Sequence, residues 1–358
     1  MAPCSTPCGV NENYMQVISL IKHRELLAGA VVRDLESGKE HEVQAKAIVN
    51  ATGVFADGIR RLDEPGARTV LAPSQGTHLV LPKSFLPGDS AIMVPNTPDG
   101  RVLFAVPWHD HVVIGTTDLA VDDIALEPIA TDEEIEFILT SIAKYLHKPP
   151  RRSDVLSVYA GLRPLVKVGD ARSTAALSRD HTILISNSGL LTIAGGKWTT
   201  YRKMAQATVD QAETLAGLDE RPCQTSHLQI HGWTRQHIEE PNLRVYGADA
   251  AAVHAIANEE PDRAGRLHPE LPYIEAEIVW AVRDEMARTV EDVLSRRTRA
   301  LLLGARASVE CAPRVARLIA AVLGRVEGWE RQAVADYCKV AQNYLISIEA
   351  SAPRIRPV

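Results

Sequence analysis

The residues best suited to chemistry in this sequence follow a short apolar run at 190–193 that is expected to form a strand. The run ends at Gly195 and Gly196, and Lys197 then precedes a stretch, 201–212, whose apolar residues recur at helical spacing. A helix N-terminus presents unpaired N–H groups and positive dipole, and glycines let a ligand approach the backbone closely. The pattern predicts an anion site, with an ordinary strand–helix turn whose lysine faces water as the alternative.

Three arginines extend this cationic pattern. Arg163 follows an expected strand at 155–162, Arg179 precedes one at 182–186, and Arg202 lies in the expected helix. Because Arg163, Arg179 and Lys197 flank strand ends, we expect them to converge on one edge of a sheet, where they would suit a phosphate dianion. The simpler alternatives are that Arg163 caps a strand end, that Arg179 pairs with Asp180 on the surface, and that Arg202 is structural.

The elements that position these residues form a β-rich block and a helical block, separated by a linker-like stretch at 216–233. A helix at 131–146 has Thr131 as its cap and Glu134 at capping-box distance. The other expected strands are 16–21, 28–34, 42–50 (a meander running into a buried strand that ends at Thr52 and Gly53), 77–81, 91–94, 102–106 and 112–116. The other expected helices are 54–60, 275–287, 289–294, 300–303, 315–323 (opened by Ala312 and Pro313, stopped by Gly324) and 329–348.

Composition narrows the class of protein. The chain has 358 residues, 46% of them hydrophobic, and a net charge of −6, which is ordinary for a globular protein and argues against a nucleic-acid-binding surface. Five scattered cysteines without a CxxC pair disfavour a disulfide framework and a zinc site. Apolar runs fall short of the roughly 18 residues that a membrane span needs. Residues 1–13 lack the pattern of a secretory signal, and we expect them to be arbitrary sequence around a misplaced start.

Several motifs occur in a fixed order along the chain, at residues 50–53, 75–82, 106–108, 114–118, 159–164, 178–180, 195–202, 280–294 and 296–299. On these motifs the chain, from about Tyr14 to its end, resembles the FAD-dependent, quinone-linked glycerol-3-phosphate dehydrogenases. The family's Gly-x-Gly-x-x-Gly segment, which holds the FAD pyrophosphate, occurs nowhere in this sequence. We therefore expect a truncated member of the family, and substoichiometric FAD in this stretch alone.

The resemblance implies an α/β (α+β) FAD-dependent oxidoreductase fold, N-terminally truncated, with an antiparallel substrate sheet and an all-helical C-terminal domain. Residues 14–215 would form the partial FAD-binding and substrate domain, which is D-amino-acid-oxidase-like, and residues 235–350 the helical domain. The helical region from about 241 is expected to fold on its own.

The resemblance also implies roles for single residues. His78, Arg163 and Lys197 would be catalytic, with His78 as the proton acceptor near the flavin; a satisfied core histidine is the alternative. The glycerol phosphate would be bound by Arg163, Arg179 and Lys197, with Thr116 or Thr117 nearby. The FAD would be contacted by Thr52, Gly53, Gly195, Gly196, Lys197, Trp198 and Thr199. No metal is implied.

The implied activity is oxidation of sn-glycerol 3-phosphate to dihydroxyacetone phosphate with FAD, the electrons passing to a quinone. The resemblance further implies peripheral attachment to a mitochondrial or bacterial inner membrane and leaves a homo-oligomer open. The residues themselves show no calcium loop of the Asp-x-Asp-x-Asp-Gly type after the helical region, and the net charge indicates no nucleic-acid partner. Two alternatives remain: another FAD-dependent amine or amino-acid oxidase of the same superfamily, which the phosphate-suited cations disfavour, and a truncated non-catalytic remnant.

Overall fold

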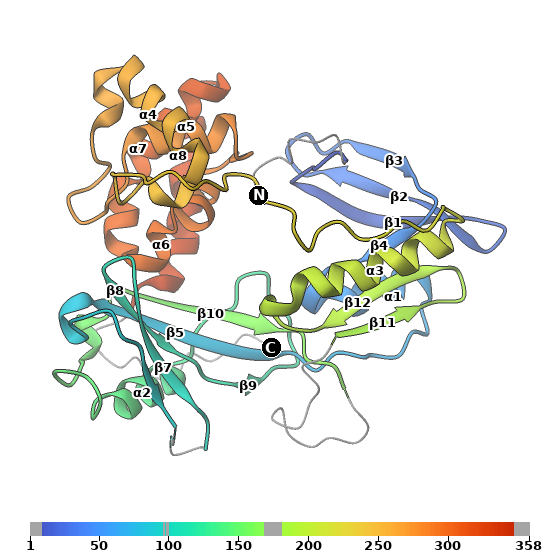
Figure 1. The fold of residues 1–358 in the computed structure, drawn as a ribbon, viewed down its shortest axis with the longest axis horizontal. Helices are drawn as coiled ribbons and strands as arrows, with labels where there is room; N and C mark the ends of the chain where they lie inside the picture. Colours follow the sequence, from blue (N-terminus) through green and yellow to red (C-terminus); the bar gives the residue numbers. More distant parts are fainter. Residues whose placement is uncertain (1–8, 96, 98–99, 168–180, 347–358) are drawn as a thin grey trace.

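The computed structural model describes residues 9–346, apart from 96, 98–99 and 168–180. Figure 1 shows a β-rich part formed by three sheets, beside a helical part formed by the C-terminal third of the chain. The sheets have the strand orders β1-β2-β3, β10-β5-β8-β7-β6 (with β9 pairing β5) and β11-β12-β4.

The first sheet is the expected meander, but its last strand is shorter than predicted. β1 (Met15–His23), β2 (Leu26–Asp34) and β3 (Glu40–Gln44) pair antiparallel in order. The single expected strand 42–50 is wrong, because the chain leaves this sheet after Gln44 and β4 (Ile48–Asn50) pairs parallel with β12. The expectation that β4 is buried is also wrong: only Asn50 is buried, and Val49 is 43% exposed, since β4 is at the edge of the described sheet.

The second sheet carries most of the β core. Its strands are β5 (Ser74–Pro82), β6 (Ile92–Val94), β7 (Leu103–Trp108), β8 (His111–Gly115), β9 (Leu119–Ala120) and β10 (Ser157–Arg163). Helix α2 (Asp132–Ile142) packs its apolar residues, among them Ile138 and Ile142, against one face of this sheet. Both hydrogen bonds of the predicted capping box between Thr131 and Glu134 are present, although α2 ends at Ile142.

The third sheet pairs a hairpin from the end of the β-rich part with β4 from near its beginning. Its hairpin, β11 (His181–Ile185) and β12 (Leu190–Gly195), leads through η5 (Trp198–Thr200) into the predicted helix α3 (Tyr201–Leu215). Helix α1 (Ala56–Asp63), preceded by η1 (Gly53–Phe55), also contacts β12. A small core of Ala56, Leu71, Val166 and Ala194 combines residues from α1, β12 and the segments that flank β5 and β10. This core fixes the ends of β5 and β10 against the third sheet.

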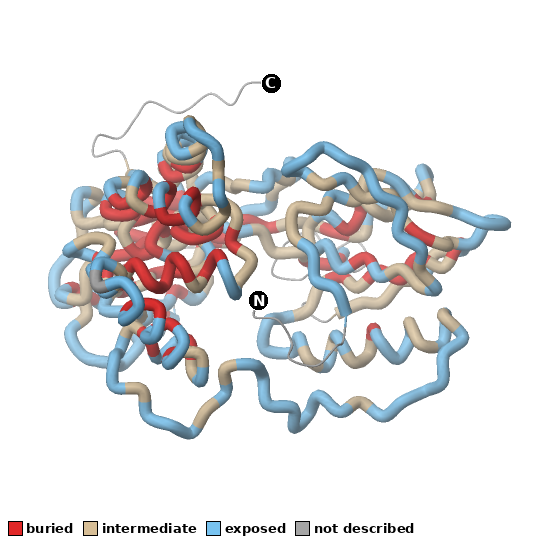
Figure 2. Tube along the Cα trace, turned by 90° about the horizontal axis from the view of Figure 1, so that it is seen from above, coloured by how far each residue is buried: buried red, intermediate tan, exposed pale blue. Residues whose placement is uncertain are grey.

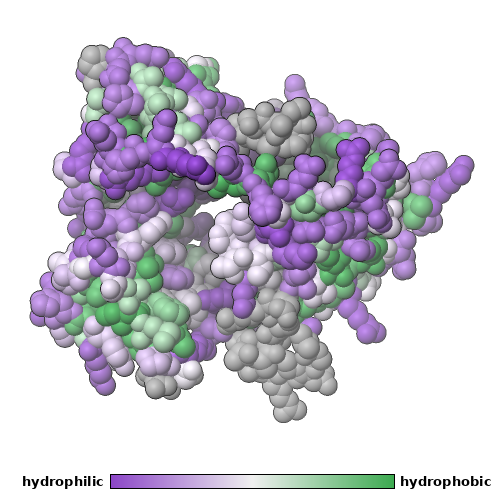
Figure 3. Space-filling view, in the orientation of Figure 1, coloured by the Kyte–Doolittle hydropathy of each residue, from purple (hydrophilic) through white to green (hydrophobic). Residues whose placement is uncertain are grey.

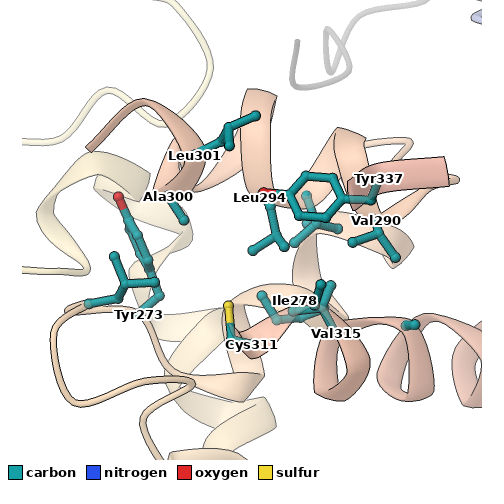
Figure 4. Packing of buried hydrophobic residues seen from close by; sticks show 14 of the residues in the cluster. Tyr273, Ile278, Val290, Leu294, Ala300, Leu301, Cys311, Val315 and Tyr337 are labelled. Atoms are coloured by element: carbon teal, nitrogen blue, oxygen red, sulfur yellow. The ribbon is translucent and has the colours of Figure 1, made fainter. Parts of the chain in front are cut away.

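The helical part follows a largely exposed segment, 216–243, which Figure 2 shows as a mostly pale-blue tube joining α3 to the helices. Its core is built from buried residues such as Ile278, Leu294, Val315 and Tyr337, seen together in Figure 4. Its elements are η6 (Arg244–Asp249), α4 (Ala250–Glu259), η7 (Pro261–Ala264), α5 (Glu275–Arg283), the π-helical turn η8 (Asp292–Arg297), α6 (Ala300–Leu303), α7 (Ala305–Leu323), α8 (Trp329–Ala341) and η9 (Gln342–Tyr344).

Several helix boundaries differ from the sequence expectation here, and the start of α7 differs most. Pro313 does not open a helix but lies inside α7, which runs on through it for 19 residues. A proline costs a helix one backbone hydrogen bond. Buried residues before and after Pro313 in α7, such as Ala307 and Val315, pack in the same core and offset that loss. The predicted stop at Gly324 is confirmed, since it adopts the left-handed conformation with φ of 60°.

A buried carboxyl in this part makes its stability depend on pH. Glu277 is 1% exposed and accepts hydrogen bonds from Tyr246 Oη, the Ile274 backbone and Asn242 Nδ2, yet burial raises its pKa to about 7. Because the folded state then binds a proton more tightly than the unfolded state, folding stability falls as pH rises from about 4.5 to 7.

We expect Glu277→Gln to remove most of this dependence, which is on the order of 3 kcal/mol for this group. The variant should be more stable than wild type at pH 8 and no more stable at pH 4, as measured by urea unfolding at both pH values. Glu330→Gln, which removes the same charge at an exposed position in α8, should follow the wild-type pH dependence. Parallel wild-type and Glu277→Gln curves would contradict the assignment.

Candidate active site

The side chains of His78, Tyr159 and Arg163 lie on one face of the six-stranded sheet. In the register of β10 and β5, Tyr159 is opposite His78, and Arg163 is four residues beyond Tyr159 and so on the same face. The rings of His78 and Tyr159 stack with centroids 5.2 Å apart and an interplanar angle of 11°. The face opposite α2 therefore presents an imidazole, a phenol and a guanidinium together.

Glycines on the neighbouring strands make room for these side chains. A Cβ added to Gly115, which pairs with His78 across β8 and β5, would come within 2.3 Å of the His78 ring. A Cβ added to Gly76 would come within 2.3 Å of Arg163 Nη2 and 2.6 Å of Thr116 Oγ1. Such separations are far below van der Waals contact, so the two glycines are needed for the imidazole and the guanidinium to lie flat on the sheet.

The imidazole of His78 is uncharged at neutral pH. Burial, with a further contribution from the positive charge of Arg163, lowers the pKa of His78 to about 4. Burial raises the pKa of Tyr159 to about 12, so its phenol stays protonated. A neutral imidazole beside a cation is able to accept a proton from a bound substrate. The alternative of a satisfied core histidine is equally compatible with a neutral ring.

The guanidinium of Arg163 is held in place by the segment that follows β8. Its Nη2 donates to Thr116 Oγ1 at 3.0 Å and to the Thr117 carbonyl oxygen at 3.1 Å, and its Nη1 lies 3.9 Å from Asp118 Oδ1. Asp118 in turn accepts a hydrogen bond from the Ser74 hydroxyl. The Arg163 side chain keeps 30% of its surface exposed, while its Nη1 atom is buried, so the guanidinium is held in place with part of the side chain open to solvent.

The two threonines point in different directions. The hydroxyl of Thr116 lies against Arg163, as expected for a residue near the phosphate site. The hydroxyl of Thr117, which is 4% exposed, donates to Glu134 Oε1 at 2.5 Å on the α2 side of the sheet. A direct role in binding substrate stays a prediction for Thr116, whereas the side chain of Thr117 is already engaged with the protein.

The predicted FAD-contacting residues lie at the carboxyl ends of β4 and β12. Buried Asn50 joins these ends, since its Nδ2 donates to the Ala56 carbonyl oxygen and to Thr192 Oγ1, and its Oδ1 accepts from the Thr52 hydroxyl. Gly53 has φ of 60°, and a Cβ added there would meet no atom within 4 Å. The backbone after β4 is therefore open to a ligand.

The turn after β12 has the conformation that its glycines predict. Gly195 and Gly196 have φ of 74° and 83°, in the left-handed region that glycine favours, and they lead to Lys197, Trp198 and Thr199, all exposed. Trp198 is 82% exposed and stacks on Tyr201 with ring centroids 5.3 Å apart. The turn thus offers backbone N–H groups, one lysine and an aromatic surface at the start of α3.

The cations do not share one sheet edge, and that prediction is wrong. Arg163 ends β10 of the six-stranded sheet, whereas Lys197 follows β12 of the three-stranded sheet, because the chain crosses between sheets after β10. Figure 1 shows β10 running toward the third sheet. Arg179 lies outside the described residues. Arg202 donates hydrogen bonds to Gln206 and Thr225, as expected for the alternative in which Arg202 is structural.

Sequence reasoning missed several residues of this arrangement. Asp118 and Tyr159 lie inside the motifs at 114–118 and 159–164, but the sequence alone indicates no role for them; in the structure they contact Arg163 and His78. Glu134 was assigned to the helix cap alone. Within the residues that the structure describes, no group of three or more His, Cys, Asp or Glu side chains is arranged to hold a metal ion.

The described residues fit one end of a flavin. The open backbone at Gly53, the left-handed Gly195 and Gly196, and the exposed aromatic side chain of Trp198 provide N–H donors and apolar surface for a planar polar ring. The sequence contains no Gly-x-Gly-x-x-Gly segment, so no residue of this chain is assigned to a pyrophosphate.

Comparison with known proteins gives two family matches. Residues 13–202 match the model of FAD dependent oxidoreductases, and residues 188–333 match the C-terminal domain of alpha-glycerophosphate oxidase. A solved structure of glycerol-3-phosphate dehydrogenase from Bacillus halodurans, complexed with FAD, superposes with a TM-score of 0.81 at 28% identity, covering 95% of this chain and 71% of that chain.

Curated relatives agree. The chain is 41% identical to a probable mitochondrial glycerol-3-phosphate dehydrogenase of Caenorhabditis elegans over 88% of its own length and 46% of that protein. It is 36% identical to the mitochondrial glycerol-3-phosphate dehydrogenase of Homo sapiens over 93% of its length and 49% of that protein. The chain thus spans about half the length of these relatives. With the domain model over residues 13–202, the chain belongs to the FAD dependent oxidoreductase family, and its C-terminal part matches the C-terminal domain of alpha-glycerophosphate oxidase.

Proposed function

We propose that this chain carries the substrate-binding and proton-accepting side of an enzyme that oxidises sn-glycerol 3-phosphate to dihydroxyacetone phosphate. The observation that carries the proposal is the pairing of an uncharged His78 with a fixed, partly exposed Arg163 on one face of the six-stranded sheet. A phosphate dianion suits the guanidinium, and a secondary alcohol next to it suits a neutral base.

The proposed reaction removes two hydrogens from the substrate alcohol, one as a proton from the C2 hydroxyl and one as a hydride from C2. His78 accepts the proton of the C2 hydroxyl, while the C2 hydrogen leaves with the bonding electron pair and the C2–O bond becomes a carbonyl. Bound FAD supplies the two-electron acceptor for that hydride. Arg163 binds the phosphate bidentately. Burial is the main cause of the lowered pKa of His78 and the charge of Arg163 is the smaller one, so a bound dianion would offset only the smaller cause.

Lys197 and the turn around it are proposed to serve the flavin side of the site. The N–H groups after Gly195 and Gly196 and the ammonium of Lys197 would stabilise negative charge that develops on the ring during reduction. Thr52, Gly53, Trp198 and Thr199 are proposed as further flavin contacts. Arg179 remains a proposed phosphate ligand on the sequence motif alone.

The electron acceptor and location are proposed from the relatives. Mitochondrial glycerol-3-phosphate dehydrogenases are among them, and we propose a quinone as acceptor and peripheral association with an inner membrane, mitochondrial in the first instance. None of the described helices is long and apolar enough to cross a bilayer. A homo-oligomer is left as a proposal for sedimentation analysis.

A substrate comparison tests the proposed function against the amine-oxidase alternative. Protein loaded with FAD is mixed anaerobically with glycerol 3-phosphate, glycerol or sarcosine, and flavin bleaching is followed by absorbance. We expect glycerol 3-phosphate to bleach the flavin at least 100-fold faster than glycerol at equal concentration, because a charge-assisted bidentate contact contributes a few kcal/mol. Faster bleaching by sarcosine would overturn the assignment, and a purified chain that takes up no FAD at all would favour a non-catalytic remnant.

A further inference from the structure

The capping glutamate of helix α2 makes more contacts than a helix cap requires. In the capping box, Glu134 Oε2 accepts from the Thr131 backbone N–H at 3.0 Å, while the Glu134 N–H donates to Thr131 Oγ1. These two bonds would complete the cap of an exposed helix end. Glu134 is instead 6% exposed, and its carboxylate extends beneath the six-stranded sheet.

The additional contacts of Glu134 lead to the strand segment under the candidate site. Gln75 Nε2, on β5, donates to Glu134 Oε2 at 2.8 Å, and the Thr117 hydroxyl donates to Oε1 at 2.5 Å. The Thr117 hydroxyl also accepts from the Thr77 backbone N–H at 2.9 Å. Gln75, Thr77 and Thr117 are all less than 5% exposed, so these bonds form in a region without competing water.

From Thr117 the chain of contacts reaches Arg163 directly. The carbonyl oxygen of Thr117 accepts from Arg163 Nη2, and the residues on either side, Thr116 and Asp118, hold the same guanidinium. Glu134 therefore fixes, from the α2 side of the sheet, the short segment whose three residues hold Arg163 on the opposite side. The carboxylate does not contact the guanidinium itself.

We propose that Glu134 is a positioning residue that sets the place of the Arg163 guanidinium through Thr117. The proposal rests on the proposed phosphate-binding role of Arg163. Its physical basis is that a bidentate ion pair requires both partners in a narrow geometry, so a guanidinium free to move with residues 116–118 would lose affinity without losing charge.

The decisive variant is Thr117→Val, which keeps the side-chain volume but removes the hydroxyl that donates a hydrogen bond to Glu134. A second variant, Glu134→Gln, alters the acceptor of the same hydrogen bond. Thr117→Ser keeps the hydroxyl and should restore the wild-type behaviour. Thr131→Ala is the matched control, because it weakens the α2 cap and leaves the Thr117–Glu134 bond in place. Melting temperatures are measured for all four.

The first readout is the affinity of the full chain for glycerol 3-phosphate by calorimetry. We expect Thr117→Val and Glu134→Gln to weaken binding at least 10-fold, and Thr117→Ser and Thr131→Ala to change it less than 3-fold. Equal weakening by Thr117→Val and Thr131→Ala would reduce Glu134 to a structural cap and overturn the proposal. So would unchanged binding in both Thr117→Val and Glu134→Gln.

The second readout is the titration of the His78 ring by NMR, which needs neither substrate nor flavin. Arg163→Met calibrates the effect of removing the cation, and we expect Thr117→Val to shift the titration of His78 in the same direction, with Thr117→Ser unchanged. If wild type fails to bind glycerol 3-phosphate, the proposed function fails, and this titration still decides the positioning role. An unshifted His78 in Thr117→Val would then overturn it.

Discussion

His78→Gln should lower the turnover of glycerol 3-phosphate by about 10²–10⁴-fold, the usual contribution of a positioned general base. Glutamine occupies similar space beside Gly115 and Tyr159 but has no basic nitrogen, so the C2 hydroxyl keeps its proton as the hydride leaves. The measurement is kcat and kcat/KM per bound FAD. The loss should appear mainly in kcat, because Arg163 still binds the phosphate.

The matched control is Tyr159→Phe, which preserves the ring that stacks on His78 and removes only the hydroxyl. It should retain kcat within about 10-fold. In wild type, kcat/KM should fall as pH falls through the pKa of His78, about 4, because protonation removes the base. A His78→Gln enzyme with nearly full turnover would show that His78 is a structural residue of the sheet.

In a version of the protein that also contains the segment for the FAD pyrophosphate, Arg163→Lys should reduce kcat/KM for glycerol 3-phosphate by about 30-fold to 1000-fold, corresponding to about 2–4 kcal/mol. Lysine keeps the charge but loses the fork, which donates to Thr116 and would donate to the phosphate at the same time. Flavin content should not change, because Arg163 is on the six-stranded sheet, whereas the predicted flavin contacts follow β4 and β12 of the sheet β11-β12-β4.

Plain glycerol is the control substrate for this prediction. It has no phosphate, so its slow oxidation should be nearly the same in wild type and in Arg163→Lys. An equal loss for glycerol and glycerol 3-phosphate would mean that Arg163 supports the sheet or the flavin, and the phosphate role would be abandoned.

Local signals in the sequence predicted much of the fold. Thr131 and Glu134 specify the start of α2 by their spacing alone, and the left-handed Gly195, Gly196 and Gly324 are at the turns where glycine is required. Such features depend on neighbours within a few residues. The strands of the six-stranded sheet were likewise visible as short apolar runs separated by turn residues.

Features that depend on tertiary contacts were not predictable in the same way. The break between β3 and β4 follows from pairing with different partners, and Pro313 is tolerated because α7 is packed on both sides of it. Proximity of Arg163 and Lys197 to strand ends did not reveal that the strands belong to different sheets. The links from Glu134 to Gln75 and Thr117 join residues 59 and 17 positions apart, which no periodicity encodes.

The exposure of apolar side chains is another feature that the sequence did not predict. Met93, Phe104 and Val106 belong to the six-stranded sheet and are 40% or more exposed, and Figure 3 shows hydrophobic side chains gathered over the part of the molecule where β5 to β8 lie. Sequence alternation identified these strands but not how far each side would be covered, because coverage depends on where α2 and the helical part pack.

The most direct measurement is a crystal structure of the protein with glycerol 3-phosphate bound. The account predicts two phosphate oxygens at about 3 Å from the Arg163 guanidinium and the C2 hydroxyl within hydrogen-bond reach of the His78 ring. A phosphate bound elsewhere, with Arg163 still engaged only by Thr116, Thr117 and Asp118, would contradict it.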